Sequence, residues 1–74
     1  MLTKVNEILK LLLEIEFDEN SDLKRSEVSE WDSLKHIELV MLLEEEFNIR
    51  LKDSDLSNLT STKQIVETIS KYVD

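Results

Sequence analysis

Apolar residues recur along this chain at helical spacing, most clearly in its first segment. Steps of three, three, one, three and one place them on one face of a helix: Leu2, Val5, Ile8, Leu9, Leu12 and Leu13. Charged residues fall on the opposite face, at Lys4, Glu7, Lys10 and Glu14. The pattern predicts an amphipathic helix with Thr3 as its N-cap that fades near Phe17.

The segment 33–47 (SLKHIELVMLLEEEF) returns to the helical period and has two different faces. One face is expected to pack in the core and is mostly apolar: Leu39, Val40, Leu43 and Phe47, with His36 among them. The other face interleaves apolar residues with carboxylates: Ser33, Leu34, Ile37, Glu38, Met41, Glu44 and Glu45. The second face is unusual, because an outer helix face is ordinarily charged and polar.

Between these two segments, residues 18–32 lose the helical period. Asp, Asn, Ser and Glu dominate there, and these short polar side chains compete with helix formation by bonding to nearby backbone groups. Three spaced apolar residues, Leu23, Val28 and Trp31, favour an ordered loop that lies over the core.

The last third of the chain predicts two more helices. A short helix is expected over 53–59, and Ser61 and Gln64 have the spacing of a capping box that opens a final helix. We therefore expect one all-α domain over 1–74. It is a small bundle of three longer helices and one short helix, with a long loop between the first two long helices.

Length and composition exclude several classes of protein. The chain has 74 residues, with no Gly, Pro or Cys and a single His. Without Cys we expect no disulfide, no thiolate zinc site and no cysteine nucleophile, and one His argues against a multi-histidine metal centre. A domain of this size buries only about 60% of its unfolded surface, so a pocket of about 300 Å³ or more would consume much of the core. We do not expect an enzyme.

The chain is acidic, and its net negative charge is concentrated in one part of the sequence. Its formal net charge is −8, and residues 14–46 hold 12 acidic and 3 basic residues against 5 and 6 in the remainder. This balance argues against nucleic acid and anionic membranes as partners. Because the negative charge surrounds the helix expected at 33–47, it favours docking of basic proteins over a charge that only maintains solubility.

We expect a cytoplasmic protein, because the sequence shows neither a membrane span nor a signal peptide. No apolar run approaches the ~20 residues of a membrane span. Charged residues interrupt the apolar positions at helical spacing, whereas a signal peptide needs an unbroken apolar stretch.

Asp32, Ser33 and His36 have the residue types of a hydrolase triad. Hydrolysis also requires an oxyanion hole and a substrate cleft, and a chain this small is not expected to enclose them. The helical period also turns His36 away from Ser33, so we expect the imidazole at the edge of the core, against Trp31.

Two stretches, 18–22 and 53–57, begin like calcium-binding loops. Both lack the glycine at the sixth loop position and the bidentate glutamate at the twelfth. Turn and capping roles explain these residues better, and no metal site is expected.

Ser33 stands where the acidic loop meets the second long helix. A helix N-terminus presents free backbone N–H groups and a partial positive charge, which favours an attached phosphate. Asp32 is placed to cap the same helix and leave the Ser33 hydroxyl exposed. From the residues alone, an ordinary role for Ser33 as a capping or first helical residue is slightly favoured over a modified serine.

Asp32-Ser33-Leu34, followed at fixed spacing by the run 37–47 (IELVMLLEEEF), resembles the signature of acyl carrier proteins. The similarity continues without gaps through Leu51 and on to about Ile69, so that it covers nearly the whole chain. Length and acidity also fit this family.

The resemblance implies a carrier whose Ser33 bears a 4′-phosphopantetheine arm, taken from coenzyme A by a phosphopantetheinyl transferase. The thiol of the arm holds acyl groups as thioesters, as in fatty-acid or polyketide biosynthesis. Partners would be acyl-loading, acyl-modifying and acyl-transferring enzymes with basic patches, and the carrier is expected to act as a monomer. By resemblance, the recognition surface comprises Asp32, Leu34, Ile37, Glu38, Met41, Glu44 and Glu45.

The residues around Ser33 also depart from the commonest form of the family. Trp31 stands where a small residue is usual, Lys35 replaces a frequent acidic residue and His36 a frequent Thr or Val. This form is similar to stand-alone carriers of specialised bacterial pathways. The alternative function is an unmodified acidic helical adaptor that binds basic proteins through residues 34–45.

Overall fold

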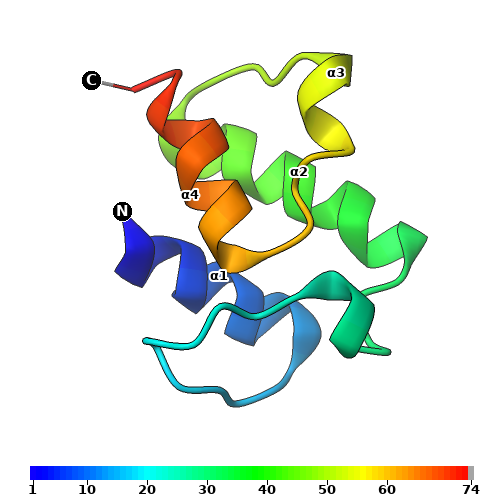
Figure 1. Ribbon diagram of the computed structural model, residues 1–74. Helices are drawn as coiled ribbons and strands as arrows, with labels where there is room; N and C mark the ends of the chain where they lie inside the picture. The colour runs from blue at the N-terminus through cyan, green and yellow to red at the C-terminus, as the bar shows by residue number, and fades with distance from the viewer. Residues whose placement is uncertain (74) are drawn as a thin grey trace.

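Residues 1–73 are described in a computed structural model, and they form four α-helices (Figure 1). In chain order these are α1 (Leu2–Leu13), α2 (Ser33–Phe47), α3 (Asp53–Leu56) and α4 (Thr62–Ser70). A single turn of 3₁₀ helix, η1 (Arg25–Glu27), interrupts the long loop before α2. The predicted all-α bundle, with three longer helices, one short helix and a long loop between the first two, is confirmed.

The ends of α1 differ from the prediction. The N-cap is Met1, whose carbonyl accepts the first helical bond from the Val5 N–H at 3.0 Å, and Thr3 lies inside the helix. The helix ends at Leu13 because Glu14 adopts the left-handed conformation, with φ 55° and ψ 43°. The expected continuation towards Phe17 is therefore wrong.

Helix α2 has the bounds that the sequence predicts. The Asp32 carboxylate accepts a hydrogen bond from the Lys35 N–H at 2.9 Å and thereby caps the first turn. Asn48, with φ 53° and ψ 52°, ends the helix in the left-handed conformation, which asparagine tolerates better than most residues.

The start of α4 is also capped as expected. The Ser61 hydroxyl accepts from the Gln64 N–H at 3.2 Å, and the Asp22 carboxylate from the long loop accepts from the Lys63 N–H at 2.8 Å. The short helix α3 is one turn long and ends at Leu56, three residues earlier than predicted.

One hydrophobic core lies where α1 packs against α2 and α4. Its buried apolar side chains are Val5, Ile8, Leu9, Leu12, Leu13, Trp31, Leu39, Leu43, Leu51, Leu59, Ile65 and Ile69. From the apolar face expected for α2, Leu39 and Leu43 are fully buried, whereas Val40 and Phe47 are half-buried at its margin.

The long loop is tied to the start of α4. Leu23 exchanges hydrogen bonds with Thr62, and the Arg25 N–H donates to the Thr60 carbonyl at 2.8 Å. Figure 1 shows the loop passing α1 and the start of α4 before it reaches α2. These bonds confirm an ordered loop and fix the position from which α2 begins. No helix within residues 1–73 has the length and apolar character needed to cross a membrane.

We expect Leu43→Ala to lower the free energy of unfolding by about 2–5 kcal/mol, because truncating a fully buried leucine leaves a cavity. Leu11→Ala makes the same chemical change at a side chain that is 80% exposed. This control should change the free energy of unfolding by less than about 0.5 kcal/mol. Urea unfolding followed by circular dichroism measures both. Equal losses in the two variants would contradict the assigned core.

Candidate functional site

Ser33 is the first residue of α2, and its side chain is exposed. Within residues 1–73 its hydroxyl makes no hydrogen bond, since the capping role is taken by the preceding Asp32. The sequence left open whether Ser33 is itself a cap, and the structure assigns that role to Asp32. The Ser33 hydroxyl therefore stands free at a helix N-terminus.

The electrostatic field at this point favours a negative group. The first N–H groups of a helix have no intrahelical acceptor and carry the positive end of the helix dipole. Asp32 accepts from the N–H of Lys35, and no acceptor is present for the N–H groups of Ser33 and Leu34 among residues 1–73. A phosphate ester on the Ser33 oxygen fits this environment.

An exposed apolar strip runs along α2 from Ser33. Leu34, Ile37 and Met41 are 64%, 60% and 63% exposed, which is unusual for three large apolar side chains on one helix face. Asp32 and Glu45 are exposed as well. The structure thus places these predicted recognition residues at the surface.

The two remaining predicted recognition residues have structural contacts. Glu44 is half-buried, and its carboxylate accepts from the Leu51 N–H at 2.8 Å, which anchors the chain that follows α2. Glu38 lies 3.7 Å from the Lys35 ammonium, a surface ion pair of small energetic value. Sequence pattern alone did not show the contact of Glu44, because its partner is a backbone group seven residues away.

His36 lies at the edge of the core beside Trp31, as the sequence predicts. The two rings stack with centroids 6.2 Å apart, and the indole N–H donates to the imidazole Nδ1 at 3.0 Å. The imidazole Nε2 lies 2.9 Å from the Leu56 carbonyl. Both ring nitrogens are thus engaged away from Ser33, so the residues do not form a hydrolytic triad.

Tyr72 makes a further polar contact that the sequence did not reveal. Its hydroxyl donates to the Asp55 carboxylate of α3 and accepts from the Lys52 N–H at 3.2 Å. Tyr72 follows the end of α4 at Ser70, and the sequence pattern gave no sign of a partner for its hydroxyl. As a result, two side chains contact α3, His36 at Leu56 and Tyr72 at Asp55.

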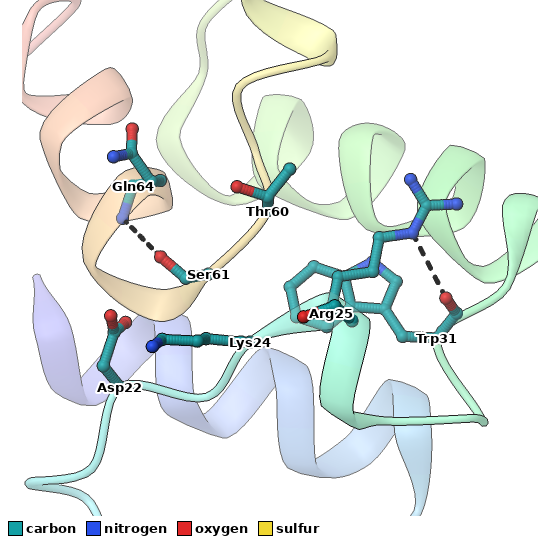
Figure 2. A pocket seen from close by; sticks show the side chains of 8 residues that line it. Asp22, Lys24, Arg25, Trp31, Thr60, Ser61 and Gln64 are labelled. Atoms are coloured by element: carbon teal, nitrogen blue, oxygen red, sulfur yellow. Dashed lines mark hydrogen bonds between the residues drawn. The ribbon is translucent and has the colours of Figure 1, made fainter.

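An open hollow of about 550 Å³ lies between the long loop and the start of α4 (Figure 2). Ser61 and Asp22 on its wall cap α4, and the Arg25 Nε–H donates to the Trp31 carbonyl at 3.2 Å. Its polar groups therefore hold the loop in place and do not form a catalytic constellation. Among residues 1–73 no group of three or more His, Cys, Asp or Glu side chains is placed to hold a metal ion.

Comparison with known proteins agrees with this geometry. Residues 2–69 match the family model described as "Phosphopantetheine attachment site". The chain is 52% identical over 42 residues to an acyl carrier protein of Buchnera aphidicola, covering 57% of this chain and 54% of that protein.

Two further relatives carry the same description. Identity is 47% over 38 residues to an acyl carrier protein of Cyanidium caldarium, covering 51% of this chain and 44% of that protein. Identity is 43% over 42 residues to acyl carrier protein 4, chloroplastic, of Arabidopsis thaliana, covering 57% of this chain and 31% of that protein. The matches thus span about half or less of the length of these relatives.

We expect the contact of Tyr72 with Asp55 to weaken at alkaline pH. The pKa of the Tyr72 hydroxyl lies above its ordinary value of 10.0, chiefly because its O–H donates to the Asp55 carboxylate. A raised folded pKa gives a stabilisation that is fully present below the unfolded pKa, about 10, and is lost as pH rises through the folded pKa.

The measurement is the difference in the free energy of unfolding between wild type and Tyr72→Phe from pH 7 to 11. It should stay constant up to about pH 10 and shrink above that value. A difference that already declines between pH 7 and 9 would contradict the assigned contact.

Proposed function

This chain belongs to the acyl carrier protein family, whose cofactor is phosphopantetheine and whose members are carriers and not enzymes, and from that premise we propose that Ser33 is its attachment residue. The observation that carries the proposal is the free, exposed Ser33 hydroxyl at the N-terminus of α2, behind a cap supplied by Asp32. A visiting enzyme can reach this oxygen without unfolding any part of the domain.

The local geometry supports a covalently held phosphopantetheine. Its phosphodiester would lie at the positive end of the α2 dipole, close to the free N–H groups of the first turn. When bound, the group supplies a terminal thiol that holds acyl groups as thioesters. Because the chain has no Cys, this thiol would be its only one.

The outer face of α2 is the proposed docking surface. Exposed Leu34, Ile37 and Met41 offer apolar contact beside the attachment point. Asp32, Glu38 and Glu45 add negative charge, which speeds encounter with a basic patch and sets its orientation. Glu44 contributes its charge to this field while it holds the Leu51 N–H.

We propose two kinds of partner enzyme. They are a phosphopantetheinyl transferase that acts on coenzyme A, and acyl-loading, acyl-modifying and acyl-transferring enzymes with basic docking patches. The setting would be fatty-acid or polyketide biosynthesis, with the carrier acting as a cytoplasmic monomer formed by the single domain 1–74.

A second candidate is an unmodified adaptor that binds basic proteins through the same face of α2. The exposure of Leu34, Ile37 and Met41 favours it equally, since a docking surface needs no modification. The two functions differ in the chemistry of Ser33 alone, so the mass of the protein separates them.

Incubation with coenzyme A, Mg²⁺ and a broad-specificity phosphopantetheinyl transferase should add the mass of one phosphopantetheinyl group to the intact chain. Ser33→Ala should abolish this gain, because the acceptor oxygen is lost. Ser29→Ala is the matched control, since Ser29 is an exposed serine of the preceding loop. Intact-protein mass spectrometry reads all three.

Retention of the added mass in Ser33→Ala would place the attachment elsewhere. Failure of the wild type to gain mass with several transferases would favour the unmodified adaptor.

For docking, we expect Glu45→Lys to slow association with a basic partner such as the transferase by about threefold or more at low ionic strength. The effect should shrink as salt screens the charge. Glu67→Lys, on the exposed side of α4, makes the same change in net charge away from α2 and is the control. Surface plasmon resonance measures the association rates, and equal rates for the two variants would remove α2 as the docking face.

A further inference from the structure

The Trp31 indole and the His36 imidazole form a hydrogen-bonded chain that ends on α3. The indole N–H can only donate, so the imidazole Nδ1 that it meets at 3.0 Å must be an unprotonated acceptor. The Leu56 carbonyl can only accept, so the Nε2 at 2.9 Å must carry the proton. The geometry requires a neutral imidazole protonated at Nε2, and a cationic imidazole can keep only the contact with Leu56.

This chain of bonds fixes the backbone immediately before the attachment residue. Trp31 is 3% exposed, its N–H donates to the Val28 carbonyl at 3.1 Å, and its carbonyl accepts from Arg25 at 3.2 Å. The bond to His36 immobilises the indole itself. Asp32 and Ser33 follow directly, so the direction in which α2 presents Ser33 depends on how the indole is held.

The same imidazole holds the end of α3. That helix is one turn long and has no fully buried residue, and Leu56 is half-buried. The contact of its carbonyl with His36 and the contact of Asp55 with Tyr72 are therefore its principal polar anchors. Loss of the His36 contacts would therefore loosen both the turn before Ser33 and the end of α3.

We infer that His36 is a positioning residue for the modification of Ser33, which acts in its neutral form by locking the Trp31 indole to α3. This inference rests on the proposed function. Without the bond from the indole to His36, the turn before Ser33 samples orientations that a transferase recognises less well.

The composition of the chain makes the lock directly measurable. Trp31 and His36 are the only Trp and the only His, so indole fluorescence and imidazole nitrogen resonances each report one residue. In the wild type we expect the ¹⁵N shifts at neutral pH to show the Nε2–H tautomer. We also expect the indole emission to report whether the bond from Trp31 to His36 is formed.

His36→Gln is the matched variant, because a glutamine amide can accept from the indole and donate to the Leu56 carbonyl without titrating. Its indole emission should stay close to that of the wild type. His36→Phe keeps a ring in the same place and removes both hydrogen bonds, so its emission should be that of an indole released from the contact.

The functional readout is the transferase reaction with each carrier as the varied substrate. At neutral pH, the KM for His36→Phe should be about threefold or more above that for the wild type, with little change in kcat. His36→Gln should keep the wild-type KM.

Equal KM values for wild type and His36→Phe would overturn the positioning role, as would an Nδ1–H tautomer at neutral pH. A wild type that is not modified would overturn the carrier proposal, and with it the role of His36 in modification. The difference in emission between wild type and His36→Phe and the tautomer would still decide whether the contact exists, so the two failures are distinguishable.

Discussion

The hydrogen bond from the Lys35 N–H to the Asp32 carboxylate determines where the second long helix begins, and the remaining features of the site depend on it. Because Asp32 supplies the cap, Ser33 becomes the first helical residue and its hydroxyl is left without a structural task. Packing of Leu39 and Leu43 in the core fixes the rotation of α2 about its axis. That rotation leaves Leu34, Ile37 and Met41 in solvent.

A small core explains why the functional chemistry lies at the surface. The buried side chains of α1, α2 and α4 fill the space between the helices, and the hollows that remain are open to solvent and are walled by groups that cap helices. A domain of this size gains stability by filling its interior, which leaves no enclosed volume for a reaction. The proposed covalent arm on the exposed N-terminus of α2 would remove the need for such a volume.

Much of this organisation could be predicted from the sequence, because the periodic elements are governed by local rules. The bounds of α2 follow from Asp32 and the apolar period, and the start of α4 follows from the Ser61 cap. The end of α1 was not predictable in the same way, since Glu14 adopts a left-handed conformation that its residue type does not favour. The contacts of Glu44 with Leu51 and of Tyr72 with Asp55 join segments whose separation no helical period encodes.

The candidate site was predictable to a different degree at each residue. Ser33 and the exposed strip of α2 follow from their place on the helix, whereas the orientation of Ser33 depends on the loop that precedes it. Adjacency of Trp31 and His36 was expected, but the extension of their contact to the Leu56 carbonyl required the position of α3. Tertiary contacts therefore determine how Ser33 is oriented, whereas the local sequence determines which residues form the site.

The central claim to test is the proposed covalent bond between phosphorus and the Ser33 oxygen. A through-bond ¹H–³¹P correlation spectrum of the coenzyme A-treated protein, with assigned serine resonances, detects that bond without cleaving the chain. The account predicts one phosphodiester resonance coupled to the β protons of Ser33, with the helical shifts of α2 retained. Coupling to the β protons of any other serine, or no coupled phosphorus at all, would contradict it.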